Sequence, residues 1–263
     1  MSNGEAHPPS PHSRRRHRMF IVRRLAAACL VVLLVAGAIA LVKSLFGDSS
    51  SVTAPTDEST GSVSPGDSAV PPVGGVLLLG DSDAVGLASS LGRALPGRVL
   101  TVVAKSASGL ARPDFFDWPA AMQTEVGRAR PKLVVMVIGA NDGQGLRNAD
   151  KVWVVGHAPT VNDAAWRAEY AKRVATAMDF LSADGRTVVW VGVANHPGRS
   201  TRMRLSVQDA VVRSAAAQRP GRVVYIDVWK LFDAPDGSYT TSVVDPTDGR
   251  YKQVRSADGF HLN

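Results

Sequence analysis

The chain has 263 residues, enough for one large domain or two small ones, and 45% of them are apolar, as in ordinary globular proteins. Its net charge of +7 is unevenly placed, because residues 1–24 hold six arginines and one glutamate and so carry five of the seven net positive charges. A charged tail on a nearly neutral remainder excludes a nucleic-acid-binding face as the favoured interpretation, and no nucleic-acid partner is expected.

An uncharged apolar run, Leu25–Val42, follows the basic tail. Its 18 residues are at the short end of what crosses a bilayer, and extension to Phe46 lengthens it. By the positive-inside rule, residues 1–24 are predicted to be a cytoplasmic tail, 25–46 a single-pass signal anchor in the cell membrane, and the rest extracytoplasmic. The Arg-rich and Pro-rich flank disfavours a buried core helix.

A cleaved signal peptide is the alternative, since residues 36–38 and 38–40 both resemble small-residue cleavage sites. Both lie inside the apolar run, which favours an uncleaved anchor, and either segment exports the remainder of the chain. Cys29, the only cysteine, lies in this run, so no disulfide is expected in the exported part. Residues 47–74 are rich in Ser, Thr, Pro and Gly and are expected to form a disordered linker.

From residue 75 onward, apolar runs alternate with amphipathic segments. Strands are predicted at 76–79, 99–104, 133–138, 187–193 and 223–228, and helices at 84–95, 119–129, 164–181 and 203–218. Fully apolar strands that alternate with helices indicate a parallel sheet covered on both faces. Residues 75–263 are therefore predicted to form one three-layer α/β/α domain around a central, mostly parallel five-stranded sheet of flavodoxin-like order.

Polar loops follow the first three predicted strands, at Gly80-Asp81-Ser82, at residues 106–113 and at Gly139-Ala140-Asn141-Asp142. In a parallel sheet these loops meet at one edge, where they can line a single cleft. Each loop taken alone also fits an ordinary turn. Near the end of the sequence, Asp258 precedes His261 by three residues, a spacing that lets the carboxylate fix the tautomer of the imidazole.

These four segments, in this order, resemble the SGNH (GDSL-type) hydrolase superfamily over residues 75–263. Ser108-Gly109-Leu110-Ala111-Arg112-Pro113-Asp114-Phe115-Phe116-Asp117-Trp118 further resembles an uncharacterised, membrane-anchored bacterial branch of it. The resemblance implies that Ser82 is the nucleophile, His261 its base and Asp258 the orienting acid. It also implies an oxyanion hole made by the backbone N–H groups of Ser82 and Gly109 and the side-chain amide of Asn141.

Two features depart from the family. Asp83 stands where the family name expects leucine, and the sequence ends at Asn263, two residues after His261, where the family continues with a helix over this loop. Either the sequence is a fragment, or fraying is expected for a base so near its end. The Gly-x-Ser-x-Gly elbow of other serine hydrolases is absent around Ser82, and no cofactor and no metal site are expected.

The predicted function is an exported, membrane-anchored serine esterase that removes acyl groups, O-acetyl among them, from small molecules or cell-envelope glycans. An O-acyltransferase that uses the same serine is the alternative within this chemistry, and a catalytically silent glycan-binding or scaffolding module is the alternative outside it. Residues 115–118 suit either sugar stacking or the core, with the core favoured. Residues 141–163 suit either a lid or a solvated excursion. The oligomeric state is left open.

Overall fold

A computed structural model describes residues 74–245, 248–259 and 261–262. The predicted tail, anchor and linker lie outside these residues, apart from Gly74. The chain divides into two units, Met1–Asp67 with Val244–Arg250 and Ser68–Val243 with Tyr251–Asn263, and the predicted α/β fold lies in the second. Across the described ranges, no helix is both long enough and apolar enough to span a bilayer.

A five-stranded parallel sheet is the centre of this unit. Its strands are β1 (Val76–Gly80), β2 (Leu100–Ala104), β3 (Leu133–Val137), β6 (Thr187–Val191) and β7 (Val223–Ile226). They are ordered β2-β1-β3-β6-β7, and each neighbouring pair is parallel. This order is the flavodoxin-like one, which confirms the predicted sheet. The wholly apolar composition of β1 and β3 follows from their burial on both faces.

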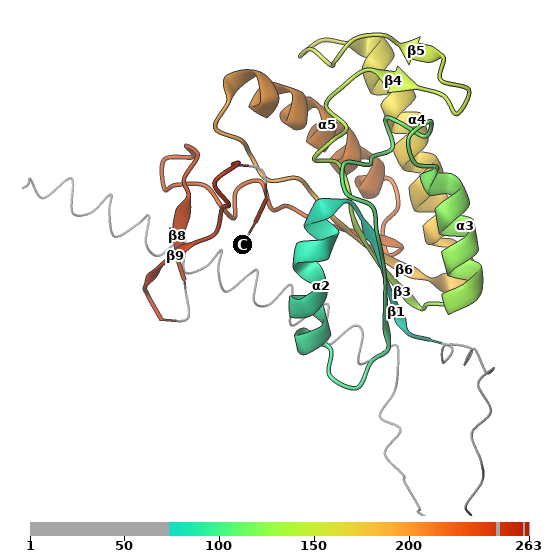
Figure 1. The fold of residues 1–263 in the computed structure, drawn as a ribbon, viewed down its shortest axis with the longest axis horizontal. Helices are drawn as coiled ribbons and strands as arrows, with labels where there is room; N and C mark the ends of the chain where they lie inside the picture. Colours follow the sequence, from blue (N-terminus) through green and yellow to red (C-terminus); the bar gives the residue numbers. More distant parts are fainter. Residues whose placement is uncertain (1–73, 246–247, 260, 263) are drawn as a thin grey trace, which may run out of the picture. The chain divides into compact units, whose positions relative to one another are not determined.

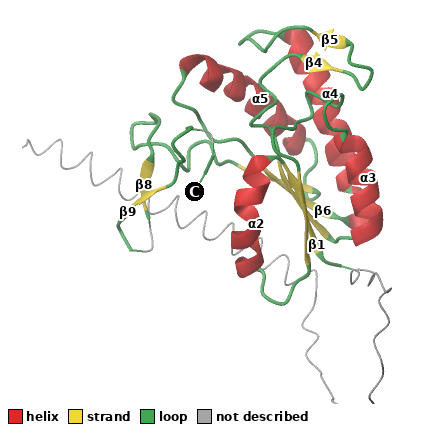
Figure 2. Ribbon diagram, in the orientation of Figure 1, coloured by secondary structure: helices red, strands yellow, loops and turns green. Residues whose placement is uncertain are grey.

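Four long helices connect the strands: α2 (Ser82–Ala94), α3 (Trp118–Ala129), α4 (Ala164–Leu181) and α5 (Arg199–Ala217). Helix α2 lies on one face of the sheet and α3 and α4 on the other (Figures 1 and 2), while α5 packs against α4. The predicted three layers are therefore present. Helix α5 begins four residues before its predicted start, because the arginines of its first turn hide the apolar periodicity.

Aspartates begin three of the helices. Asp81, Asp117 and Asp163 are the N-caps of α2, α3 and α4, and each carboxylate accepts a hydrogen bond from a backbone N–H of the first turn. Such a cap satisfies one of the donors that a helix start leaves unpaired and suits its partial positive charge.

Shorter elements lie outside the sheet. Within 141–163, β4 (Leu146–Arg147) and β5 (Trp153–Val155) pair as an antiparallel hairpin. Leu146 and Val155 are buried in the main core, so part of this predicted excursion is packed rather than solvated. The 3-10 turn η1 (Ala183–Gly185) and the strands β8 (Ser242–Val244) and β9 (Tyr251–Gln253) complete the elements.

The core contains three fully buried tryptophans, Trp118, Trp166 and Trp190. The ring of Phe116 lies edge-on to Trp118 with 4.9 Å between centroids, and Trp166 stacks on Tyr170 at 4.7 Å. Trp118 and Phe116 therefore belong to the core, whereas the ring of Phe115 is 52% exposed.

Candidate active site

Ser82 lies where β1 ends and α2 begins. It is the first residue of α2, directly after the N-cap Asp81, whose Oδ1 accepts a hydrogen bond from the Asp83 N–H at 3.0 Å. The carboxyl end of a parallel strand and the amino end of a helix both favour ligands here, the second because its N–H groups attract negative charge. The sequence predicts this position for Ser82, and the fold puts it there.

A hairpin at the end of the described chain brings His261 to Ser82. The two ends of this hairpin are joined by a β-bridge between Arg255 and Leu262, and the Ser256 N–H donates to the His261 carbonyl at 2.9 Å. His261 Nε2 lies 2.8 Å from Ser82 Oγ, although 179 residues separate the two in sequence. The predicted nucleophile and base are thus within hydrogen-bond distance.

Asp258 contacts His261 twice. Its Oδ2 lies 2.5 Å from Nδ1 of the imidazole, and its Oδ1 accepts a hydrogen bond from the His261 backbone N–H at 3.1 Å. The carboxylate therefore fixes both the ring and the backbone that carries it. The hydrogen bond that the imidazole donates to Asp258 raises the pKa of His261, and the charges of Asp258, Asp83 and Asp81 act in the same direction.

Asn141 joins two loops of the predicted oxyanion hole. Its Nδ2 donates to the Ser108 carbonyl at 3.0 Å and lies 3.4 Å from Oδ2 of Asp81. In the described part of the chain, the backbone N–H groups of Ser82 and Gly109 donate to no other group. Two free backbone donors and one amide thus belong to segments that meet at this end of the sheet, as the sequence predicts.

Asp142 is a site residue to which the sequence patterns assign no role. It is fully buried and accepts hydrogen bonds from the N–H groups of Leu110 at 3.0 Å and Ala111 at 2.8 Å, and from the Tyr170 hydroxyl at 2.8 Å. A Cβ on Gly109 would overlap its carboxylate, so only glycine fits there. Burial raises the pKa of Asp142 to about 6, opposed by these hydrogen bonds.

Asp83, the departure from the family, lies half-buried beside the pair of Ser82 and His261. Burial raises the pKa of Asp83, whereas the neighbouring charges of His261 and Arg255 lower it. Burial and these two neighbouring groups thus act in opposite directions on the pKa of Asp83.

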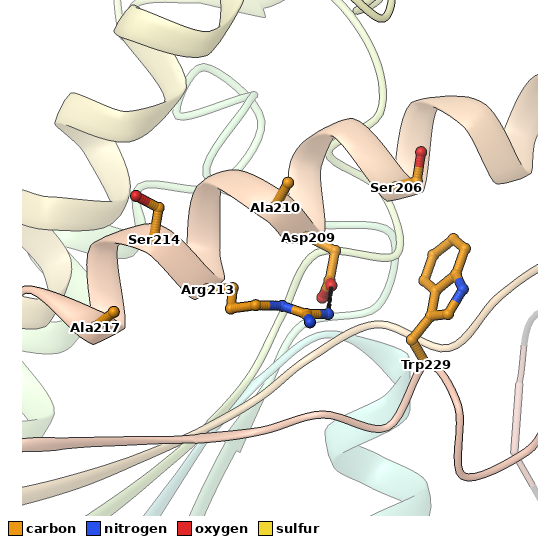
Figure 3. A pocket seen from close by; sticks show the side chains of 7 residues that line it. All are labelled: Ser206, Asp209, Ala210, Arg213, Ser214, Ala217 and Trp229. Carbon is orange, nitrogen blue, oxygen red and sulfur yellow. Dashed lines mark hydrogen bonds and ion pairs between the residues drawn. The ribbon is translucent and has the colours of Figure 1, made fainter.

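An open groove of about 500 Å³ follows α5 and involves none of these residues (Figure 3). Asp209 and Arg213 form an ion pair of 2.9 Å along it, and Trp229 lies at one end. Within the ranges that the structure describes, no three His, Cys, Asp or Glu side chains gather as metal ligands would.

Solved structures with a similar arrangement of elements include LAE5, an alpha/beta hydrolase enzyme from the metagenome of Lake Arreo, Spain. It is 21% identical, with a TM-score of 0.47 over 74% of this chain and 91% of its own. The lipase/acylhydrolase from Enterococcus faecalis is 18% identical, with a TM-score of 0.45 over 72% of this chain and 87% of its own. A GDSL-like lipase from Bacteroides thetaiotaomicron is 13% identical, with a TM-score of 0.45 over 72% and 79%.

No curated protein matches the sequence. One family model does, and it covers residues 75–263, which contain Ser82, Gly109, Asn141, Asp258 and His261. The matched region is more than half of the chain and includes every strand and helix described above. The chain belongs to the family described as "Protein of unknown function (DUF459)".

Proposed function

We propose that the chain is a serine esterase of the SGNH type, membrane-anchored and exported, that hydrolyses acyl esters, O-acetyl esters among them, on cell-envelope glycans. The observation that carries the ester chemistry is the hydrogen-bonded series from Asp258 through His261 to Ser82. A serine hydroxyl is a weak nucleophile at its free pKa and needs an adjacent base that a third group orients.

The proposed reaction has two halves. Ser82 Oγ attacks the ester carbonyl while His261 Nε2 takes its proton, and the imidazolium then protonates the departing alcohol as the C–O bond breaks. This leaves an acyl group on Ser82. Water, deprotonated by the same nitrogen, attacks the acyl carbon, and Ser82 recovers its proton as the acid leaves. Asp258 stays ionised and stabilises the imidazolium in both halves.

The tetrahedral intermediates carry a negative oxygen. Among the described residues the N–H groups of Ser82 and Gly109 have no acceptor and can donate to it, and the amide of Asn141 can exchange its long 3.4 Å contact with Asp81 for the stronger charge-assisted one. Loss of one such donor typically lowers turnover about 10²–10³-fold. Neutral hydrogen bonds to the substrate carbonyl thus become stronger ones as the reaction proceeds.

The proposals of export and of a glycan substrate are supported by features outside the catalytic residues. The apolar run 25–42 and the linker after it suit a domain held near the membrane. Two exposed aromatic rings suit contact with sugars: Phe115, 52% exposed, and Trp153, 46% exposed, with the Arg147 guanidinium 4.0 Å from the centroid of the Trp153 ring.

A serine-reactive phosphonate probe tests the proposal on the full chain. The wild type should be labelled at Ser82 and should hydrolyse p-nitrophenyl acetate, and Ser82→Ala should lose both properties. Ser89→Ala, which removes an exposed serine of the same helix, is the matched control and should behave as the wild type.

Two outcomes would replace the proposal. No labelling of the wild type, or labelling that is unchanged in Ser82→Ala, would favour a silent glycan-binding or scaffolding module. Labelling together with acyl transfer to an added glycan acceptor that outpaces hydrolysis would identify an acyltransferase.

A further inference from the structure

The hairpin that carries Asp258 and His261 begins at a fully buried arginine. The side chain of Arg255 is 0% exposed, and it shares full or near-full burial with one other described arginine, Arg219, at 7%. A guanidinium is rarely buried without compensation, because its desolvation costs several kcal/mol. Arg219 forms an ion pair with Asp179 in which its Nη2 lies 2.6 Å from the carboxylate, whereas Arg255 has a different environment.

The partners of Arg255 come from the segments after β6 and β7. Its Nη2 donates to Oδ1 of Asn195 at 3.0 Å, and Asn195 is itself 2% exposed. The Asn195 amide in turn donates to the Asp233 carboxylate. The rings of Phe232 and Tyr239 lie 5.5 Å and 5.4 Å from the guanidinium carbon, within the range of cation–π attraction.

Arg255 and His261 lie at opposite ends of the same short hairpin. The bridge from Arg255 to Leu262 and the hydrogen bond from Ser256 to the carbonyl of His261 tie the two ends of the hairpin together. The turn between them uses Gly259 at φ +75°, where a Cβ would approach Pro197 to 3.1 Å. Because the hairpin is this short, a shift of the buried guanidinium moves His261 relative to Ser82.

We propose that Arg255 is a positioning residue for the catalytic base: it anchors the hairpin of Asp258 and His261 to the carboxyl edge of the sheet through Asn195 and the two rings. The proposal rests on the assignment of His261 as the base. It predicts an effect on turnover rather than on substrate binding, because Arg255 is buried and away from solvent.

Three variants of the full chain test it: Arg255→Met, Arg255→Lys and, as the matched buried arginine, Arg219→Met. With p-nitrophenyl acetate below the unfolding temperature, Arg255→Met should lower kcat about 10²-fold with KM nearly unchanged, the loss expected when a catalytic group is misplaced by about 1 Å. Arg255→Lys keeps the positive charge but not the planar guanidinium, and its kcat should be about tenfold higher than that of Arg255→Met. Arg219→Met should lower the thermal midpoint and leave kcat within about twofold.

The downfield proton signal of the Asp258–His261 hydrogen bond is the second measurement, assigned by its absence in His261→Gln. It should be present in the wild type and Arg219→Met and lost or shifted in Arg255→Met, or in Arg255→Lys if the methionine variant does not fold. Unchanged kcat and an unchanged signal in a folded Arg255 variant overturn the proposal, as does an equal loss of kcat in Arg219→Met. If the wild type itself neither hydrolyses esters nor labels, the proposed function fails, and the proton signal alone decides the anchoring role.

Discussion

Aspartates precede and follow the nucleophile, and the structure gives them different surroundings. Asp81 is 1% exposed, and its Oδ2 accepts a hydrogen bond from the Gly139 N–H at 3.2 Å. It thereby ties the loop after β3 to the start of α2. Asp83 interacts instead with His261 and Arg255. One acid therefore shapes the backbone of the site, and the other contributes to its electric field.

At the same scale, Asp258→Asn should change the pH dependence of turnover. His261 acts as a base only when neutral, so activity rises as the pH passes its pKa, which Asp258 raises above the ordinary value of 6.5. Removing that negative charge lowers the pKa and moves the rising limb of kcat/KM to lower pH. Turnover itself should fall about 10²–10⁴-fold, because the imidazole loses its orientation.

A profile of kcat/KM from about pH 5 to about pH 9 checks this prediction. Asp163→Asn, which removes an N-cap aspartate from α4, serves as the control and should leave the profile in place. A limb that stays at the wild-type pH in Asp258→Asn would contradict the role of Asp258.

At the scale of elements, α4 braces the loop that supplies Gly109. The Tyr170 hydroxyl donates to Asp142, and Arg173 Nη1 donates to the carbonyls of Leu110 at 2.9 Å and Ala111 at 3.2 Å. From α3, the indole of Trp118 donates to Ser108 Oγ at 3.0 Å. Two helices on one face of the sheet thus hold the loop on which the oxyanion donor lies, which is the kind of support that a preorganised site needs.

Asp142→Asn tests this brace. The variant keeps the shape of the side chain but turns an NH₂ group toward a buried N–H, so one donor of Leu110 or Ala111 is left unpaired. We expect a loss of about 1–3 kcal/mol in the free energy of unfolding. The displaced Gly109 N–H should also lower kcat by about 10-fold or more, with a smaller change in KM.

Denaturant unfolding and steady-state kinetics measure both effects. Tyr170→Phe removes one hydrogen bond of the same carboxylate without an unpaired donor on the loop, and it should lower stability with little change in kcat. A destabilised Asp142→Asn with wild-type kcat would mean that Asp142 supports the fold and not the oxyanion loop.

For the whole molecule, the features that repeat along the sequence were predicted, whereas buried contacts between residues far apart in sequence were not. Five apolar runs separated by helical segments lead to a parallel sheet and its order, because right-handed crossovers leave few alternatives. The loops at the strand ends indicate where a cleft can form, and the resemblance to the SGNH superfamily then assigns roles in them to Ser82, Gly109 and Asn141. Asp142 is of a residue type that is common in turns. Its role depends on a hydrogen bond from Ala111, which lies 31 residues earlier in the sequence.

The same limit applies to the hairpin of the base. Asp258 and His261 are found from their spacing. Arg255, by contrast, has the sequence context of a surface arginine, and only the structure shows its contact with Asn195, 60 residues earlier in the chain. Arginine is almost never fully buried, so composition argues against the position it takes. The short strands β4 and β5 are missed because two or three residues carry no periodicity.

Buried acids near the site also make the stability of the whole domain depend on pH. Burial, followed by the charge of Asp83, raises the pKa of Asp81 from 3.8 to about 7. Between these two values the folded protein binds more protons at Asp81 than the unfolded chain does. The contribution of Asp81 to the free energy of unfolding therefore falls as the pH rises from about 4 to about 7, by at most about 1.4 kcal/mol for each pH unit.

The free energy of unfolding of the wild type minus that of Asp81→Asn isolates this contribution, because asparagine still caps α2 and does not titrate. The difference in the free energy of unfolding, measured by denaturant, should decrease between about pH 5 and about pH 8. The same subtraction with Asp179→Asn should be flat over that range, since the hydrogen bond from Arg219 lowers the pKa of Asp179 and the arginine stays charged. A flat difference for Asp81→Asn would mean that its three N–H donors outweigh burial and keep the carboxylate beside the nucleophile ionised.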